Sequence, residues 1–134
     1  MRIQIKRERS AVMRHQITIG NQIIAVDASV AEGGEGLDAS PHDLYDAALG
    51  SCKALTVLWY ARKRGIPVED IQVNVARDDS QERADVYRLD LQVTVSGTLT
   101  EPQLAELLRV AQKCPVHKLM TEVKTEITTS LVHA

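Results

Sequence analysis

The stretch of residues 44–60 limits what this chain can fold into more than any other part of it. Nearly every residue in it is apolar or small, and Asp46 and Lys53 are its only charges. Ser40 can cap a helix before it, and Gly65 can end that helix after a cationic last turn. The pattern predicts one helix of about 24 residues, roughly 36 Å long at 1.5 Å per residue. Such a helix is expected to be buried nearly all round, in part against a second subunit.

Alternating apolar and polar residues predict strands on both sides of this helix. Gly20 and Asn21 separate two such runs and predict a tight hairpin turn between them. The first three strands are expected to form an antiparallel meander with one buried face, and the next two a long antiparallel pair. The expected strands cover residues 2–6, 16–19, 22–27, 71–75, 89–95 and 123–127.

Two further helices are expected in the last third of the chain. Thr100 can cap an amphipathic helix over 101–113, and Cys114 followed by Pro115 starts a short second helix. The resulting order, β-β-β-α-β-β-α-α-β, predicts an α+β fold, and the length predicts a single domain over residues 1–134. Residues 29–39 show no periodicity and are expected to form a mobile surface loop.

Composition argues against several classes of partner. The net charge is −2 with mixed signs, and aromatic residues make up 3% of the chain, so nucleic acid and anionic lipid are not expected as partners. No stretch approaches the ~20 apolar residues of a membrane span. The first ten residues alternate where a signal peptide would be continuously apolar. We therefore expect a cytoplasmic, reducing location.

The two cysteines, Cys52 and Cys114, are far apart in sequence and allow three interpretations: buried apolar residues, a structural disulfide or a catalytic redox pair. A reducing compartment disfavours a permanent disulfide. Cys52 lies within the apolar helix, where a lone cysteine is commonly a small buried residue. Cys114 lies at a helix start near His117 and Lys118, where a thiolate is stabilised. No further Cys or His completes a metal site with Cys114 and His117, so neither metal nor cofactor is expected.

Three segments together resemble the OsmC/Ohr family of thiol-dependent hydroperoxide reductases. The resemblance runs nearly end to end and includes the glycine-bearing loop before Ser40. It implies antiparallel sheets around a long central helix and an intertwined homodimer with active sites at the subunit interface. The segments are Ser40-Pro-His-Asp-Leu-Tyr-Asp-Ala-Ala-Leu-Gly-Ser-Cys52, Tyr60-Ala-Arg-Lys-Arg-Gly65 and Lys113-Cys-Pro-Val-His-Lys-Leu119.

The resemblance also implies roles for single residues. Cys52 would attack the peroxide and become a sulfenic acid, and Cys114 would condense with it into a disulfide. Arg14 is the best placed early arginine to supply a cation, with Arg7 and Arg9 as alternatives. The implied activity is reduction of alkyl or fatty-acyl hydroperoxides in oxidative stress defence, with an external dithiol as reductant. The alternative is a divergent relative with weak or no peroxidase activity that binds an apolar small molecule at the dimer interface.

The sequence departs from the family pattern at one point. The family places a glutamate that holds the arginine just after the proline of the central helix, whereas this chain has His42 and then Asp43. Either Asp43 substitutes for that glutamate, or the arginine is unclamped. A second conflict concerns the thiols, because the helix start favours Cys114 as the more acidic one, whereas the resemblance assigns the attack to Cys52.

Overall fold

The computed structural model describes residues 2–134, so Met1 of the predicted 1–134 domain lies outside the description. The chain divides into two compact units, one ending at Ala47 and the other beginning at Ala48. Both units combine helix with antiparallel strands, which confirms the predicted α+β class. The expectation of a single domain stays a prediction. No helix among residues 2–134 has the length and apolar character needed to cross a membrane.

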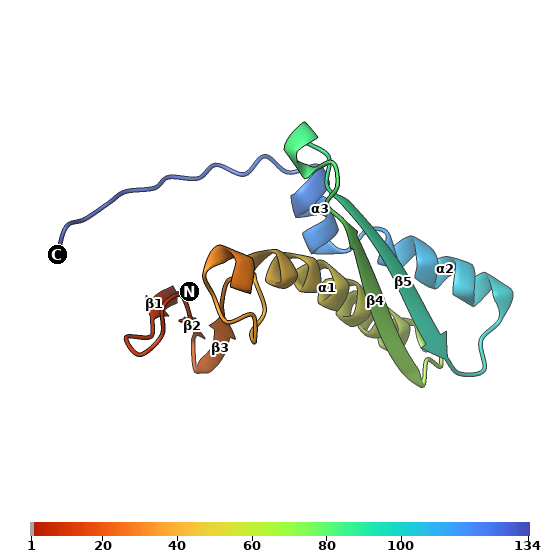
Figure 1. Cartoon of the computed structure of the whole chain (residues 1–134). Helices are drawn as coiled ribbons and strands as arrows, with labels where there is room; N and C mark the ends of the chain where they lie inside the picture. The colour runs from red at the N-terminus through yellow and green to blue at the C-terminus, as the bar shows by residue number, and fades with distance from the viewer. Residues whose placement is uncertain (1) are drawn as a thin grey trace. The chain divides into compact units, whose positions relative to one another are not determined.

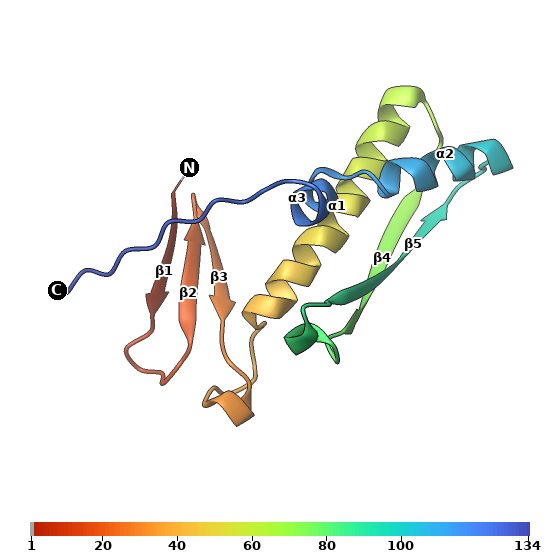
Figure 2. The ribbon, with the colours of Figure 1, turned by 90° about the horizontal axis from the view of Figure 1, so that it is seen from above.

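The first unit contains a three-stranded antiparallel meander of β1 (Ile3–Arg7), β2 (His15–Ile19) and β3 (Gln22–Val26), shown in Figure 2. Ile19 pairs with Gln22 across a two-residue turn in which Gly20 has φ 58°, so the predicted hairpin is confirmed. The sequence predicts that one face of this meander is buried, and for the single chain this prediction is wrong. Ile3 and Ile5 are 54% and 57% exposed, because β1 is an edge strand whose apolar side has no cover in this unit.

The loop after β3 is held by hydrogen bonds, although its composition predicts a mobile segment. The buried carboxylate of Asp27 accepts from the backbone N–H groups of Ala28 and Glu35, at 2.8 and 3.0 Å. A short 3₁₀ helix, η1 (Val30–Glu32), lies between them. A Cβ at Gly34 would stand 2.0 Å from the carbonyl oxygen of Ala28, so the closed loop has room only for glycine at that position.

The long central helix, α1 (Pro41–Arg64), begins and ends where the sequence predicts. Ser40 Oγ accepts from the N–H of Asp43 at 3.1 Å, and the Asp43 carboxylate accepts from the N–H of Ser40 at 2.9 Å, which is a reciprocal capping arrangement. After Arg64, Gly65 leaves the helix with φ 68°.

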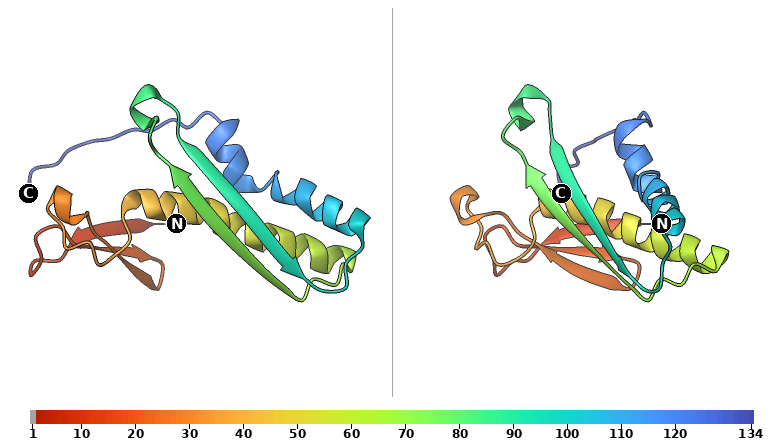
Figure 3. Two further views of the ribbon diagram at one scale, coloured as in Figure 1. Left: turned by 45° about the vertical axis from the view of Figure 1, so that its right-hand side comes forward. Right: turned by 90° about the vertical axis from the view of Figure 1, so that its right-hand side faces the viewer.

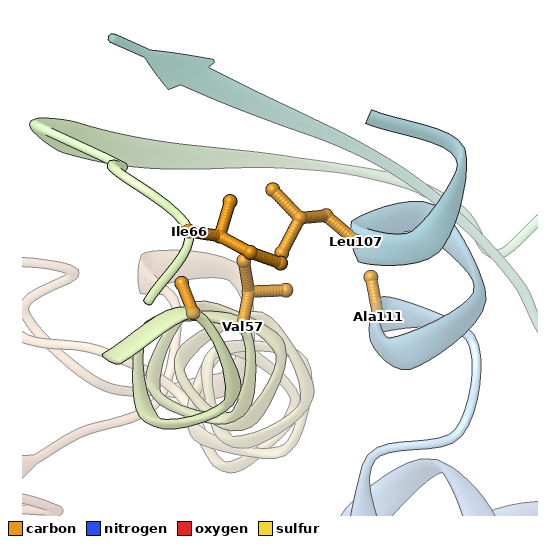
Figure 4. Close-up of a cluster of buried hydrophobic side chains, with 5 residues drawn as sticks. Val57, Ile66, Leu107 and Ala111 are labelled. Carbon is orange, nitrogen blue, oxygen red and sulfur yellow. The ribbon is translucent and has the colours of Figure 1, made fainter. Parts of the chain in front are cut away.

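In the second unit the remaining elements pack against the part of α1 that follows Ala47. The hairpin β4 (Asp70–Asp78) and β5 (Arg88–Ser96), joined through the 3₁₀ helix η2 (Glu82–Ala84), and the helix α2 (Glu101–Ala111) lie along it (Figure 3). The buried core lies between α1 and α2 (Figure 4). Its buried members are Val57, Ala61, Ile66, Leu107 and Ala111.

One stripe of α1 is buried and the opposite stripe is open to solvent. Lys53, Val57 and Ala61 follow one another at four-residue spacing and are all buried. Leu55 and Trp59 are 69% and 61% exposed. The helix is therefore not buried all round in the single chain, and its packing against a second subunit stays a prediction.

The expected closing strand over 123–127 is wrong for the described residues. The last helix, α3 (Pro115–Thr121), is followed by residues 124–134 without regular structure, and Figure 1 shows them as an extended tail. Ile127 is 80% exposed and Leu131 is 98% exposed. Alternation makes a segment suitable for a strand, but a strand forms only where a second strand offers its edge.

Candidate functional site

The structure brings the two cysteines together from helices that are far apart in sequence. Cys52 lies in the middle of α1, and Cys114 is the residue that caps the N-terminus of α3. Cys52 lies close enough to Cys114 to raise the pKa of its thiol, and both cysteines are free. Cys114 is fully buried, whereas Cys52 is partly exposed.

A backbone amide in the first turn of α3 donates a hydrogen bond to Cys52. The backbone N–H of Val116 donates to Cys52 Sγ at 3.5 Å, and the Thr56 hydroxyl lies 3.9 Å from the same sulfur. The first N–H groups of a helix have no partner within it, and such a donor stabilises negative charge on sulfur. The helix that starts at Cys114 thus directs an amide donor to Cys52, and the roles of the two thiols stay a prediction.

The start of α3 does not lower the pKa of the Cys114 thiol below its ordinary value. Burial raises the pKa of Cys114, because a thiolate loses its hydration inside the protein. The N–H of His117 pulls that pKa down, the hydrogen bond with Cys52 raises it again, and the charge of Lys53 lowers it. The sequence showed the helix start but not the depth of burial, and burial is the largest effect.

Lys53 is a member of the site that sequence reasoning missed. It is 6% exposed, and its Nζ donates to the carbonyl oxygen of Ala111 at 2.6 Å and to Nδ1 of His117 at 3.0 Å. It thereby joins α1 to the end of α2 and to α3. The available signal was its spacing, because Lys53 lies four residues from both Leu49 and Val57 on the stripe that is buried.

Gly50 lets α1 approach β4 closely, two residues before Cys52. A Cβ at this position would lie 2.9 Å from Cγ2 of Val75 and 3.7 Å from Cγ1 of Val73. Contacts below 3.0 Å force a neighbour to move, and valine side chains have little rotational freedom. The missing side chain therefore sets how near this turn of α1 lies to the hairpin.

The surface of the cavity near Cys52 is more apolar than polar, although most of its lining residues carry polar groups. Thr56 borders a cavity of about 290 Å³, within which the Tyr60 hydroxyl donates to the Glu106 carboxylate. That hydrogen bond raises the pKa of Tyr60. The other residues that line the cavity are Arg109, Val110 and Lys113.

Arg14 lies in the first unit, held between two carboxylates. Its guanidinium donates to Glu8, and its Nε donates to Asp38 Oδ2 at 2.7 Å. Asp38, and then Glu8, raise the pKa of Arg14, and Arg14 lowers that of Glu8. The sequence did not indicate these two carboxylates, which lie outside the central helix. Its role toward Cys52 stays a prediction.

No group of three His, Cys, Asp or Glu side chains among residues 2–134 has the geometry to hold a metal ion. The site brings together two neighbouring thiols, one amide donor and one buried ammonium group.

A family model described as OsmC-like protein matches residues 33–130 of this chain. The chain belongs to the OsmC-like family. The match includes the glycine-bearing loop, all of α1 and both cysteines, which confirms the resemblance found in the sequence. No curated protein shows significant sequence similarity to it.

Solved structures share the OsmC-like fold at low sequence identity. The first is a Psychrobacter arcticus protein, named provisionally as an osmotic stress induced and detoxification response protein, with 23% identity, a TM-score of 0.75 and coverage of 90% of this chain and 88% of the other. An OsmC-like protein of Mycoplasma pneumoniae has 20% identity, a TM-score of 0.71 and 99% coverage of both chains. An organic hydroperoxide resistance protein, OsmC, of Legionella pneumophila has 20% identity, a TM-score of 0.64 and coverage of 91% and 90%.

Proposed function

We propose that this OsmC-like protein is a thiol-dependent peroxidase that reduces organic hydroperoxides through Cys52 and Cys114. The observation that carries the proposal is the contact between the two thiols, one buried at a helix cap and one partly exposed. A partly exposed thiol can meet a substrate, and a buried thiol beside it can react next without being exposed to that substrate. The hydroperoxide resistance protein among the similar structures supports the same chemistry.

In the first step the Cys52 thiolate attacks the terminal oxygen of the hydroperoxide. The O–O bond breaks, the sulfur becomes a sulfenic acid, and the alkoxide leaves as an alcohol after taking up a proton. The Val116 N–H stabilises the thiolate before attack. Arg14, fixed by its two carboxylates, is the proposed cation for this step.

In the second step Cys114 attacks the sulfur of the Cys52 sulfenic acid. An S–S bond forms, the S–O bond breaks, and the oxygen leaves as water with the proton of the Cys114 thiol. An external dithiol then reduces the disulfide by two thiol exchanges and is itself oxidised to a disulfide. The two electrons that reduce the peroxide therefore come from the external dithiol.

We further propose that the protein works as a cytoplasmic homodimer in oxidative stress defence. The exposed apolar residues on α1, Leu55 and Trp59, support a second subunit at this face. The uncovered side of β1, with Ile3 and Ile5, supports the same assembly from the first unit.

The test is consumption of cumene hydroperoxide with dithiothreitol as reductant. The wild type should turn over, Cys52→Ser should not, and one equivalent of peroxide should lower the mass of the wild type by two hydrogens. A protein that binds cumene hydroperoxide without consuming it would contradict the proposal and favour the divergent binding protein. Turnover that persists in Cys52→Ser would contradict the proposed roles of the two cysteines.

A further inference from the structure

Lys53 is a buried charge whose hydrogen-bond partners are neutral. Its ammonium group donates to a backbone carbonyl and to an imidazole nitrogen, and the side chain is 6% exposed. Removing an ammonium group from water is costly unless it is well paired. A cation kept in such a place needs a compensating partner, and Cys114, on which the charge of Lys53 acts, is a neighbouring group that can become negative.

The two contacts of Lys53 fix the ends of the helices on either side of Cys114. Ala111 is the last residue of α2, so its carbonyl oxygen receives no hydrogen bond from within that helix. The helix dipole favours a cation at this end, and the Lys53 ammonium group donates to that oxygen. His117 lies in the first turn of α3 and accepts at Nδ1, which places its own proton on Nε2. Residues 112–116, which include Cys114, are thus tied down at both ends.

We propose that Lys53 is a positioning residue for the second step of the proposed peroxidase reaction: it holds Cys114 against Cys52 and supplies the positive charge that a Cys114 thiolate needs. The inference rests on the proposed function. The charge of Lys53 acts on Cys114 in the required direction, since it lowers the pKa of that thiol against the effect of burial. The other groups that act on this thiol are Cys52 from α1 and the N–H of His117 from α3.

The role is specific to the resolving step. Cys114 must lose its proton before it can attack the sulfenic acid sulfur, and burial opposes that loss. Lys53 offsets the burial without taking part in bond making or bond breaking. The atoms and electrons of the step remain those already given, with water as the leaving product.

The experiment is a single turnover with one equivalent of cumene hydroperoxide, measured from pH 6 to pH 9. Dimedone traps the Cys52 sulfenic acid, and mass spectrometry follows its conversion into the disulfide. Lys53→Met removes the charge, Lys53→Arg keeps it, and His117→Ala removes one contact but keeps the charge. Lys124→Met is the matched control, because it removes the charge of an exposed lysine that follows α3.

In Lys53→Met we expect the rate of sulfenic acid formation to stay within about twofold of the wild-type rate. The rate of disulfide formation at pH 7 should fall about tenfold, because the thiolate loses a nearby opposite charge. The pH profile of resolution should move to higher pH. Lys53→Arg should keep the profile of the wild type, His117→Ala should slow resolution without moving the profile, and Lys124→Met should change neither the rate nor the profile.

A folded Lys53→Met protein that resolves with the rate and profile of the wild type would overturn the inference. So would a Lys53→Arg profile that moves as far as that of Lys53→Met, because the effect would then be structural. If Lys53→Met does not fold, His117→Ala decides, and an unchanged resolution rate in it overturns the proposal. A wild type that forms no sulfenic acid would instead overturn the peroxidase function, and this inference with it.

Discussion

The backbone N–H of Val116 donates to the sulfur of Cys52 across 3.5 Å, although the two residues are 64 positions apart. A helix start that is capped by one cysteine thus stabilises negative charge on the other. This arrangement is consistent with the proposed order, in which Cys52 attacks the peroxide and Cys114 then forms the disulfide. It also separates the two thiols by environment, since only Cys114 is fully buried.

The fate of a sulfenic acid that has no partner tests this order. Cys114→Ser removes the group that condenses with oxidised Cys52, so excess organic hydroperoxide should carry Cys52 on to sulfinic acid. Mass spectrometry should show the gain of two oxygens on the peptide that holds Cys52. Cys52→Ser is the control and should leave Cys114 largely reduced over the same time, because that thiol is buried. Rapid oxidation of Cys114 in this control would reverse the assignment.

Stability at alkaline pH should report the buried Cys114 thiol. Its pKa in the folded protein lies above the ordinary value of 9.0, so the folded state holds the proton more tightly than the unfolded state does. Its contribution to the free energy of unfolding is complete below pH 9.0 and is lost as pH rises through the folded pKa. Urea unfolding in a reducing buffer should show this decline, at most about 1.4 kcal/mol per pH unit for one proton.

Cys114→Ala is the control for this pH dependence. The decline that remains in the variant should be the part due to Tyr60, whose pKa is also raised and which acts only above pH 10.0. Equal slopes in the wild type and the variant between pH 9 and pH 10 would contradict the assignment.

Gly50→Ala should destabilise the second unit. The added methyl group would meet Val75 at 2.9 Å, and overpacking of this kind costs about 1–3 kcal/mol. Alanine is the better helix former by about 1 kcal/mol, so we expect a net loss of up to about 2 kcal/mol in urea unfolding. In the background of Val75→Ala, which removes the clash, the same change should be neutral or stabilising. A similar loss in both backgrounds would show that the contact is not the cause.

The exposed stripe of α1 should carry the proposed dimer. Light scattering should give a dimer for the wild type at micromolar concentration, and Leu55→Lys should weaken it by about 100-fold or more if the residue is central to the interface. Leu108→Lys is the matched control, because Leu108 is similarly exposed, at 58% against 69%, but lies on α2. A monomeric wild type would contradict both the dimer and an active site between subunits.

Arg14 should be distinguishable from the other early arginines by the rate of the first step. Arg14→Gln should slow sulfenic acid formation by about 10²-fold or more, the usual effect of losing one stabilising donor. Asp38→Asn should slow it less, because the arginine keeps Glu8. Arg7→Gln and Arg9→Gln should leave it nearly unchanged. A larger loss in either control would transfer the proposed role to that residue.

Features decided by neighbours in sequence were the ones that could be predicted. The cap formed by Ser40 and Asp43 and the capping box of Thr100 and Gln103 each need only four consecutive residues, and both are present. The period of two likewise predicted five of the six expected strands, since side-chain alternation is a local property.

Features decided by contacts between distant residues could not be predicted in this way. Lys53 contacts His117 across 64 positions, and the acidity of Cys114 depends on burial that no local pattern records. The strand expected over 123–127 failed for the same reason, because pairing requires an edge supplied from elsewhere. The sequence supplied the two cysteines, and the fold supplied the donor and the cation beside them.

The buried carboxylate of Asp27 has a consequence for protein engineering. A polar loop with several glycines would ordinarily be chosen as a place to insert a tag or a foreign peptide. Here the loop closes through the hydrogen bond from the Glu35 N–H to Asp27, and Asp38 follows Glu35 by only a few residues. An insertion between Glu35 and Asp38 would displace the carboxylate that holds Arg14. This surface segment therefore has a fixed length as well as a fixed shape.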